Sequence, residues 1–294
     1  MVHNQRCHWV QWIARGLLIW LALPAFGFSD SLPIIVANQN HAPAGVLRDS
    51  VLSFHLEIAK GEWHPEDDAG IALAVYAFGE SGRPLQNPGP LIRVPQGTEI
   101  RASLHNSLTV PTTVHGLMEP GSDDAVHVAP GATEPVSFKA TTPGVYFYWG
   151  AAEVEDVKLR YGIDSELTGA LVVDPPGQIA DDEIFVMEMI SEHAGLSSRQ
   201  TLATINGKSW PFTQRFQYKI GQRVHWRWIN ATNEPHADPR IYAAMGWPST
   251  SEHRGAESRN ITLRVLGPAL KAKTHGIDSC RPTKELDQSA QAPR

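Results

Sequence analysis

Alternating apolar and polar positions predict that this chain is built from short strands. Between Ile92 and Asn106, the apolar residues Ile100, Ala102 and Leu104 alternate with polar neighbours. This period of two is typical of a strand with one buried face. Other apolar stretches that predict strands lie at 51–58, 71–78, 145–149 and 169–173, and Pro-Gly turns punctuate the series. Many short strands at regular spacing predict a β-sandwich.

A second series of strand patterns follows a boundary at Asp174-Pro175-Pro176-Gly177, where an apolar strand ends and polar residues begin. This series includes 183–190 and 224–230. We therefore predict an all-β protein with a lead-in before residue 51 and domains at 45–176 and 181–255, the second incomplete. An irregular polar tail is expected over 256–294.

The N-terminus has the pattern of a secretory signal. Arg6 and Arg15 precede an apolar run over residues 16–28, and the small residue Ser29 follows it. This run is shorter than the ~20 residues that a bilayer span needs. We predict that residues 1–29 are a signal peptide, that the mature protein is secreted or periplasmic, and that it keeps no stable membrane span.

The composition of the chain indicates its class of protein and excludes some partners and bonds. The chain has 294 residues, 42% of them apolar and 19% charged, which is typical of a globular protein long enough for two domains. A net charge of -6 argues against nucleic acid as a partner. Cys7 lies in the predicted signal, so Cys280 alone would remain in the mature chain, which excludes an intramolecular disulfide there.

Two pairs of motifs carry a family resemblance. The first is GPLIRVPQGT, which begins at Gly89, followed by TVHGL, which ends at Leu117. The second is INGKSWP, which ends at Pro211, followed by IGQRVHWRWINAT, which ends at Thr232. Over roughly residues 40 to 236 the chain resembles the multicopper oxidases. The resemblance implies two cupredoxin-like (plastocyanin-like) Greek-key sandwiches, copper as cofactor, and oxidation of a reduced metal or a phenolic small molecule.

The resemblance also implies two His-x-His pairs in the first domain, which deliver imidazoles to a copper cluster. The first pair falls on Thr113 and His115, and the second falls on Trp149 and Ala151. Only one of these four positions therefore holds an imidazole. Threonine, tryptophan and alanine are not strong copper ligands.

In the second domain the family pattern is His-x-x-His-x-His. His236 fits its first position, whereas Pro239 and Ile241 occupy the others. No His-Cys-His segment exists, so the blue-copper motif is missing too. His127 is expected to face His115 across a predicted turn and would then complete a two-histidine site. The predicted metal ligands are thus His115, His236 and His127, in a partial copper site, and no catalytic residue is predicted. The alternative is that these are ordinary hydrogen-bonded strand histidines.

Two main functions remain open. One is a secreted copper-binding oxidoreductase, and the other is a non-catalytic cupredoxin-type binding or structural module. A generic secreted sandwich for adhesion or carbohydrate binding has no positive motif, and fold alone does not give function. If the reading frame is shifted by one base, some of the possible codons for residues 238–242 encode Ile-His-Gly-Phe, which resembles the family sequence. We therefore hypothesise that the sequence after residue 237 is the product of a frameshift in an oxidase gene.

Overall fold

The computed structural model describes residues 31–119, 124–152, 160–177, 182–191, 193, 196, 200–219 and 221–232, and the backbone of 257–264. Every regular element in this part of the chain is a strand, which confirms the predicted all-β class. None of these residues belongs to a helix that is long and apolar enough to cross a membrane. The predicted signal peptide and residues 233–256, where the frameshift is hypothesised, lie outside the described residues.

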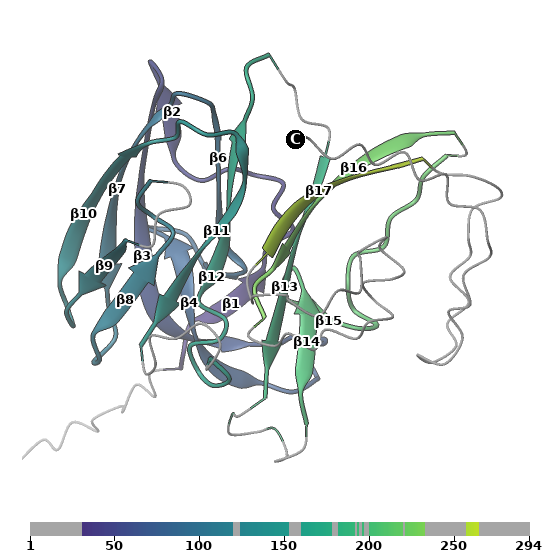
Figure 1. Ribbon diagram of the computed structural model, residues 1–294. Coiled ribbons are helices and arrows are strands. Elements are labelled where there is room, and N and C mark those ends of the chain that lie inside the picture. Colours follow the sequence, from purple (N-terminus) through teal and green to yellow (C-terminus); the bar gives the residue numbers. More distant parts are fainter. Residues whose placement is uncertain are drawn as a thin grey trace, which may run out of the picture. The chain divides into compact units, whose positions relative to one another are not determined.

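The first sheet has seven strands in the order β1-β5-β4-β3-β7-β10, with β2 paired to β3 (Figure 1). The strand β3 is the longest and pairs with β4 on one side and β7 on the other. The bounds are β1 Ile34–Ala37, β2 Val46–Arg48, β3 Val51–Trp63, β4 Leu73–Glu80, β5 Leu85–Asn87, β7 Glu99–Asn106 and β10 Thr133–Lys139.

Two five-stranded sheets complete the described fold (Figure 1). The second sheet has the order β6-β12-β11-β8-β9 and the third has the order β15-β14-β13-β16-β17. The second consists of β6 Gly89–Pro95, β8 Thr112–His115, β9 Ala125–Val128, β11 Gly144–Ala151 and β12 Thr168–Asp174. The third consists of β13 Asp182–Ile190, β14 Leu202–Ile205, β15 Lys208–Ser209, β16 Arg223–Asn230 and β17 Glu257–Arg264.

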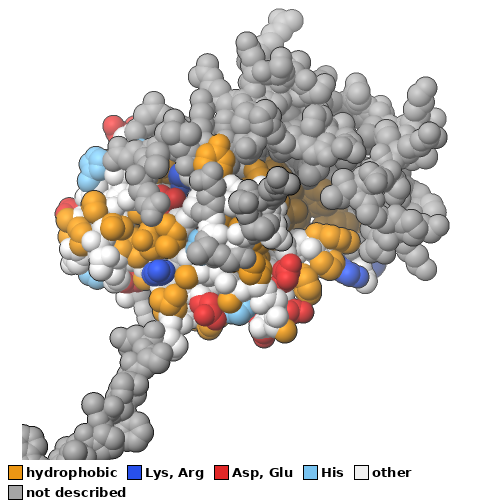
Figure 2. Space-filling view, turned by 90° about the horizontal axis from the view of Figure 1, so that it is seen from below, with side chains coloured by type: hydrophobic (Ala, Val, Ile, Leu, Met, Phe, Trp, Pro, Cys, Tyr) orange, Lys and Arg blue, Asp and Glu red, His pale blue; other side chains and the backbone are white. Residues whose placement is uncertain are grey.

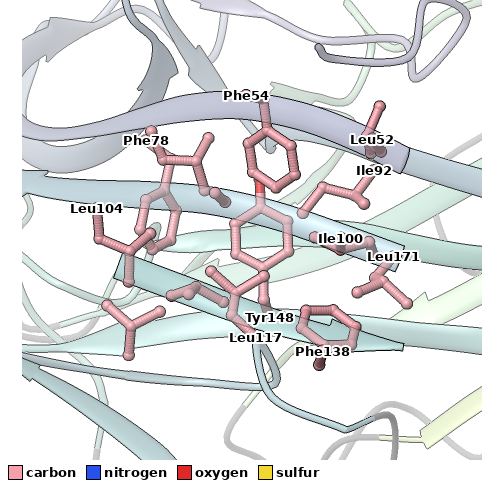
Figure 3. Close-up of a cluster of buried hydrophobic side chains, with 14 of the residues drawn as sticks. Leu52, Phe54, Phe78, Ile92, Ile100, Leu104, Leu117, Phe138, Tyr148 and Leu171 are labelled. Carbon is pink, nitrogen blue, oxygen red and sulfur yellow. The ribbon is translucent and has the colours of Figure 1, made fainter. Parts of the chain in front are cut away.

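The main core fills the space between the first two sheets. The alternation that predicted β7 is confirmed, because Ile100 and Leu104 are fully buried. At the centre lies Tyr148 on β11, with Phe78 of β4 packed edge-on at 5.1 Å between ring centroids (Figure 3). The Tyr148 hydroxyl donates a 2.6 Å hydrogen bond to the Pro90 carbonyl oxygen, so the only polar atom of this buried side chain is satisfied.

The third sheet packs on the outer face of the second. Apolar residues on alternate positions of β6 and β12 point away from the main core and form a second cluster with β13 and β16, whose members include Leu91, Ala170, Val172, Ile184 and Val186. Strands buried on both faces explain why 169–173 reads as a continuous apolar run rather than an alternation.

Two segments form strands where the sequence pattern does not predict them. The expected lead-in contains β1 and β2, and the expected irregular tail contains β17. The first of these pairs in parallel with β3 and β5, and β17 pairs along the whole of β16, from Arg223↔Arg264 to Asn230↔Glu257. Backbone hydrogen bonds to distant segments thus set these strands, and such partners cannot be identified from a local pattern.

Two arginines and two aspartates form a closed ring that joins the second and third sheets. Arg93 on β6 contacts Asp174 at 2.7 Å and Asp182 at 2.8 Å. Arg227 on β16 contacts Asp174 at 2.7 Å and also pairs with Asp182. The side chains of Asp182 and Arg227 are only 5% and 7% exposed, so this pair is screened little by solvent. The two aspartates flank the predicted domain boundary.

Replacing Gly207 by alanine is expected to lower the free energy of unfolding by about 2–4 kcal/mol. Gly207 has φ of +77°, and an added Cβ would lie 2.0 Å from the Asn87 carbonyl oxygen. The backbone must therefore move as well as adopt an unfavourable conformation. Gly82 is the matched control, because its φ is +79° but nothing lies within 4 Å of an added Cβ. Equal urea midpoints for the two alanine variants would contradict the predicted contact.

Candidate metal centre

The four positions that the family resemblance assigns to first-domain copper ligands come together on one face of the second sheet. The strands β8 and β11 pair antiparallel, with His115 opposite Trp149 and Thr113 opposite Ala151. Directly opposed residues of an antiparallel pair point to the same face, and so do residues two apart on one strand. The four side chains thus form a two-by-two array, here called the ligand array.

Two of the four side chains of the ligand array, His115 and Trp149, stack on each other. The His115 imidazole lies parallel to the Trp149 indole, with 4.1 Å between ring centroids and 10° between planes. The Arg160 guanidinium carbon lies 5.1 Å from the same indole, within range of a cation–π contact. Arg160 is itself 3% exposed and donates to the Leu167 carbonyl oxygen at 3.3 Å and to the Asp164 carbonyl oxygen. The indole therefore packs against a cation and an imidazole.

His127 lies beside the array, on β9. Its direct partner across the hairpin is Thr113, and their side chains share a 2.9 Å hydrogen bond between Oγ1 and Nδ1. His127 does not face His115 directly as predicted, because the residue opposite His115 is Ala125; His127 instead occupies a diagonal position on the same face as His115. His236 and Cys280 lie outside the described residues. The assignment of His115, His127 and His236 as ligands therefore stays a prediction.

The residues of the ligand array do not fit the family's copper cluster. They offer one imidazole, one hydroxyl, one indole and one methyl group, whereas copper in such sites is held by imidazole and thiolate. Within the described ranges, no group of three or more His, Cys, Asp or Glu side chains is placed to hold a metal ion. Neither an electron-transfer copper nor an oxygen-reducing cluster can be built from this donor set.

A buried acidic cluster is the feature that sequence reasoning missed. Glu166 and Glu188 are fully buried, and Arg160 lies close enough to influence the pKa of both. Burial lowers the pKa of Arg160, and the neighbouring carboxylates oppose this effect. Nothing in the sequence pattern signals the cluster, because a single glutamate within an apolar strand usually faces solvent.

Among the residues that the structure describes, the face shown in Figure 2 has no continuous basic area. On the described part of the face in Figure 2, Lys and Arg side chains are scattered singly, while Asp and Glu side chains and patches of hydrophobic residues lie between them. This agrees with the net charge of -6.

In a comparison with known proteins, the family match covers the whole second sheet and the strands β5, β7 and β10 of the first. Residues 85–177 match the family model described as "Multicopper oxidase". The chain is 28% identical over 207 residues to a probable nitrite reductase-hydroxylamine oxidoreductase fusion protein of Kuenenia stuttgartiensis, covering 62% of this chain and 24% of that protein. It is also 28% identical over 167 residues to a copper-containing nitrite reductase of Neisseria meningitidis serogroup A, covering 53% and 41%. The chain thus spans less than half the length of these curated relatives.

A solved structure agrees in fold. The crystal structure of a multicopper oxidase superposes with a TM-score of 0.51 at 18% sequence identity, covering 74% of this chain and 81% of that one. The ligand positions, the sheet order and these matches point to one group of folds. Residues 85–177 thus resemble the multicopper oxidases, and the described part of the chain has the predicted cupredoxin-like fold.

Proposed function

We propose that this protein is a non-catalytic cupredoxin-type module, whose first domain keeps the family fold and serves binding or structure rather than copper chemistry. The observation that supports this is the ligand array, in which one imidazole remains out of four positions. The remaining imidazole stacks on an indole that stands where the family places a second histidine. Trp149 contributes packing at this position, and an indole cannot supply the nitrogen lone pair with which a histidine would bind copper.

The stacked rings give the array a structural role of their own. A cation–π contact contributes about 0.5–2 kcal/mol, depending on how far it is desolvated. Here the guanidinium is buried and held by two carbonyl oxygens, so the stack joins β8, β11 and the loop that precedes β12. In this proposal the array stabilises the rim of the first sandwich.

A second candidate function is a secreted copper-binding oxidoreductase that acts on a reduced metal or a phenolic small molecule. The match of residues 85–177 to the multicopper oxidase model and the retained His115 favour it. Copper would then need ligands beyond the array, and the sequence offers His127 and His236 as candidates. Export from the cytoplasm, predicted from the N-terminal pattern, belongs to both proposals.

Copper retention separates the two candidates. After loading with Cu(II) and exhaustive dialysis, we expect elemental analysis to find close to no copper in the wild-type protein. A variant carrying Thr113→His, Trp149→His and Ala151→His would place imidazoles at all four array positions. We expect this restored variant to retain copper, because imidazole suits copper and the paired strands hold the four side chains on one face.

The control for adventitious binding by surface histidines is His105→Ala. His105 shares a 2.8 Å hydrogen bond with Thr133, as His127 does with Thr113, but it lies on the first sheet. Stoichiometric copper in the wild type that is lost in His115→Ala and kept in His105→Ala would overturn the proposal in favour of the oxidoreductase. Urea unfolding of each variant checks that the fold persists.

A further inference from the structure

Two glutamates from different parts of the fold meet in the interior. Glu166 immediately precedes Leu167 and β12 of the second sheet, and Glu188 lies on β13 of the third sheet. Both side chains are fully buried. Carboxylates are almost never fully buried unless they are paired or protonated. The cluster therefore requires a physical account of its charge.

The hydrogen bonds are unequally divided between the two carboxyl groups. Asn87 Nδ2 donates to Glu166 Oε2 at 2.8 Å, and the Ser165 hydroxyl donates to Glu166 Oε1 at 3.1 Å. Glu188 Oε1 accepts from the Thr168 hydroxyl. Glu188 Oε2 is buried and has no hydrogen-bond partner among the described residues. An ionised oxygen in that position would lack compensation for lost solvation, whereas a protonated carboxyl group would lose much less.

Charge balance points the same way. The described groups around the two glutamates include one buried guanidinium, Arg160, and a third buried carboxyl group, Asp164. His193 lies near Glu166 and bonds the Ala74 carbonyl oxygen through Nε2. With all three carboxyl groups ionised, one arginine cannot neutralise the cluster. Binding a proton removes one of the excess charges.

The pKa values of both glutamates are raised, that of Glu188 more than that of Glu166. Burial raises the pKa of Glu188 well above its ordinary 4.5, and the neighbouring charge of Glu166 raises it further, against the Thr168 hydrogen bond and Arg160. Burial also raises the pKa of Glu166, but hydrogen bonds from Asn87 and Ser165 and the charges of Arg160 and His193 oppose this rise. Glu188 is therefore the group that keeps its proton.

We propose that Glu188, paired with Glu166, is a buried proton-binding site that makes the contact between the third sheet and the first two sensitive to pH. Thr168 and Asn87 connect the pair to β12 of the second sheet and β5 of the first. The native state binds a proton that the unfolded chain releases near its ordinary pKa of 4.5. Stability from this site is therefore full at acidic pH and falls as pH rises above that value, until the native carboxyl ionises too.

Urea unfolding of the full chain, measured at intervals between about pH 5 and pH 9, tests this proposal. For one proton, the unfolding constant of the wild type should rise by up to about tenfold per pH unit. In Glu188→Gln this rise should be lost, because the amide keeps the shape of a protonated carboxyl without titrating. Glu166→Gln is a second variant, which removes the carboxylate that repels the ionised form of Glu188. In this variant Glu188 should release its proton at a lower pH than in the wild type, so the rise in the unfolding constant should end at a lower pH.

Glu119→Gln is the matched control, since Glu119 is exposed, and it should behave as the wild type does. Infrared difference spectra at neutral pH give an independent readout, in which a carboxylic acid band of the wild type should be missing from Glu188→Gln alone. A wild-type stability that does not fall with pH relative to Glu188→Gln would overturn the proposal, as would equal slopes in Glu188→Gln and Glu119→Gln. This test is independent of copper, so its outcome does not depend on the proposed function.

Discussion

Replacing Asp182 by alanine should lower the free energy of unfolding by about 3–5 kcal/mol, as expected when one member of a buried ion pair is removed. Asp182 accepts from Arg93 at 2.8 Å and from Arg227, whose side chain is 7% exposed. Without Asp182, both guanidinium groups keep only Asp174 as an acidic partner in the ring. Most of the loss comes from charge left buried without compensation.

Urea unfolding of Asp182→Ala, compared with Glu99→Ala, measures this effect. Glu99 also contacts an arginine, Arg101, at 2.8 Å, but both side chains are largely exposed, at 40% and 61%. Exposed pairs of this kind contribute little, so the control should unfold nearly as the wild type does. If Asp182→Ala proved as stable as Glu99→Ala, the ring could not be a buried contact between sheets.

The ring also gives a pH dependence of opposite sign to that of the buried glutamates. Burial alone would raise the pKa of Asp182, but the hydrogen bonds and charges of Arg93 and Arg227 outweigh it and hold the pKa below 3.8. The unfolded chain therefore takes up a proton before the native state does. The stability from Asp182 is present above pH 3.8 and is lost as pH falls through the native pKa.

Tyr148→Ala is the second change with a large expected effect, again about 3–5 kcal/mol of unfolding free energy, as for other large aromatic residues truncated in a core. The side chain is fully buried and packs on Phe78 at 5.1 Å. Both sheets of the first sandwich line the space that it fills (Figure 3). Truncation leaves a cavity into which the surrounding side chains of both sheets relax only partly.

Tyr148→Phe separates packing from hydrogen bonding. It keeps the ring but removes the 2.6 Å bond to the Pro90 carbonyl oxygen, so a loss of about 1 kcal/mol is expected. Thermal or urea unfolding of the two variants gives the difference directly. A loss in Tyr148→Phe as large as that in Tyr148→Ala would show that the hydroxyl, rather than the ring, carries the contribution.

Local patterns predicted most of the first sandwich because one face of each strand must be apolar. The alternation around Ile100 and Leu104 corresponds to β7, and the Pro143-Gly144 turn leads into β11. The pattern could not predict β1 or β17, whose stability comes from pairing with strands far away in the sequence. Parallel pairing of β13 with β16 is also a long-range choice.

For the candidate site, motif spacing identified the four positions of the ligand array, and strand pairing brings them together. The contacts of Trp149 with both His115 and Arg160 were not predictable, because Arg160 is contributed by a loop without regular spacing. The burial of Glu188 was not predictable for a different reason. Apolar residues occupy both faces of β13, so the sequence does not reveal that position 188 points inward.

The order in which the chain is made has a consequence for the N-terminal segment. Asn40 Nδ2 bonds Asn206 Oδ1 at 3.1 Å, and Trp63 Nε1 bonds the Gly207 carbonyl oxygen at 3.0 Å. During synthesis these early residues must wait until about residue 207 has left the ribosome before they gain their partners. The nascent first sandwich therefore lacks these polar contacts until the segment that carries Asn206 and Gly207 has been made.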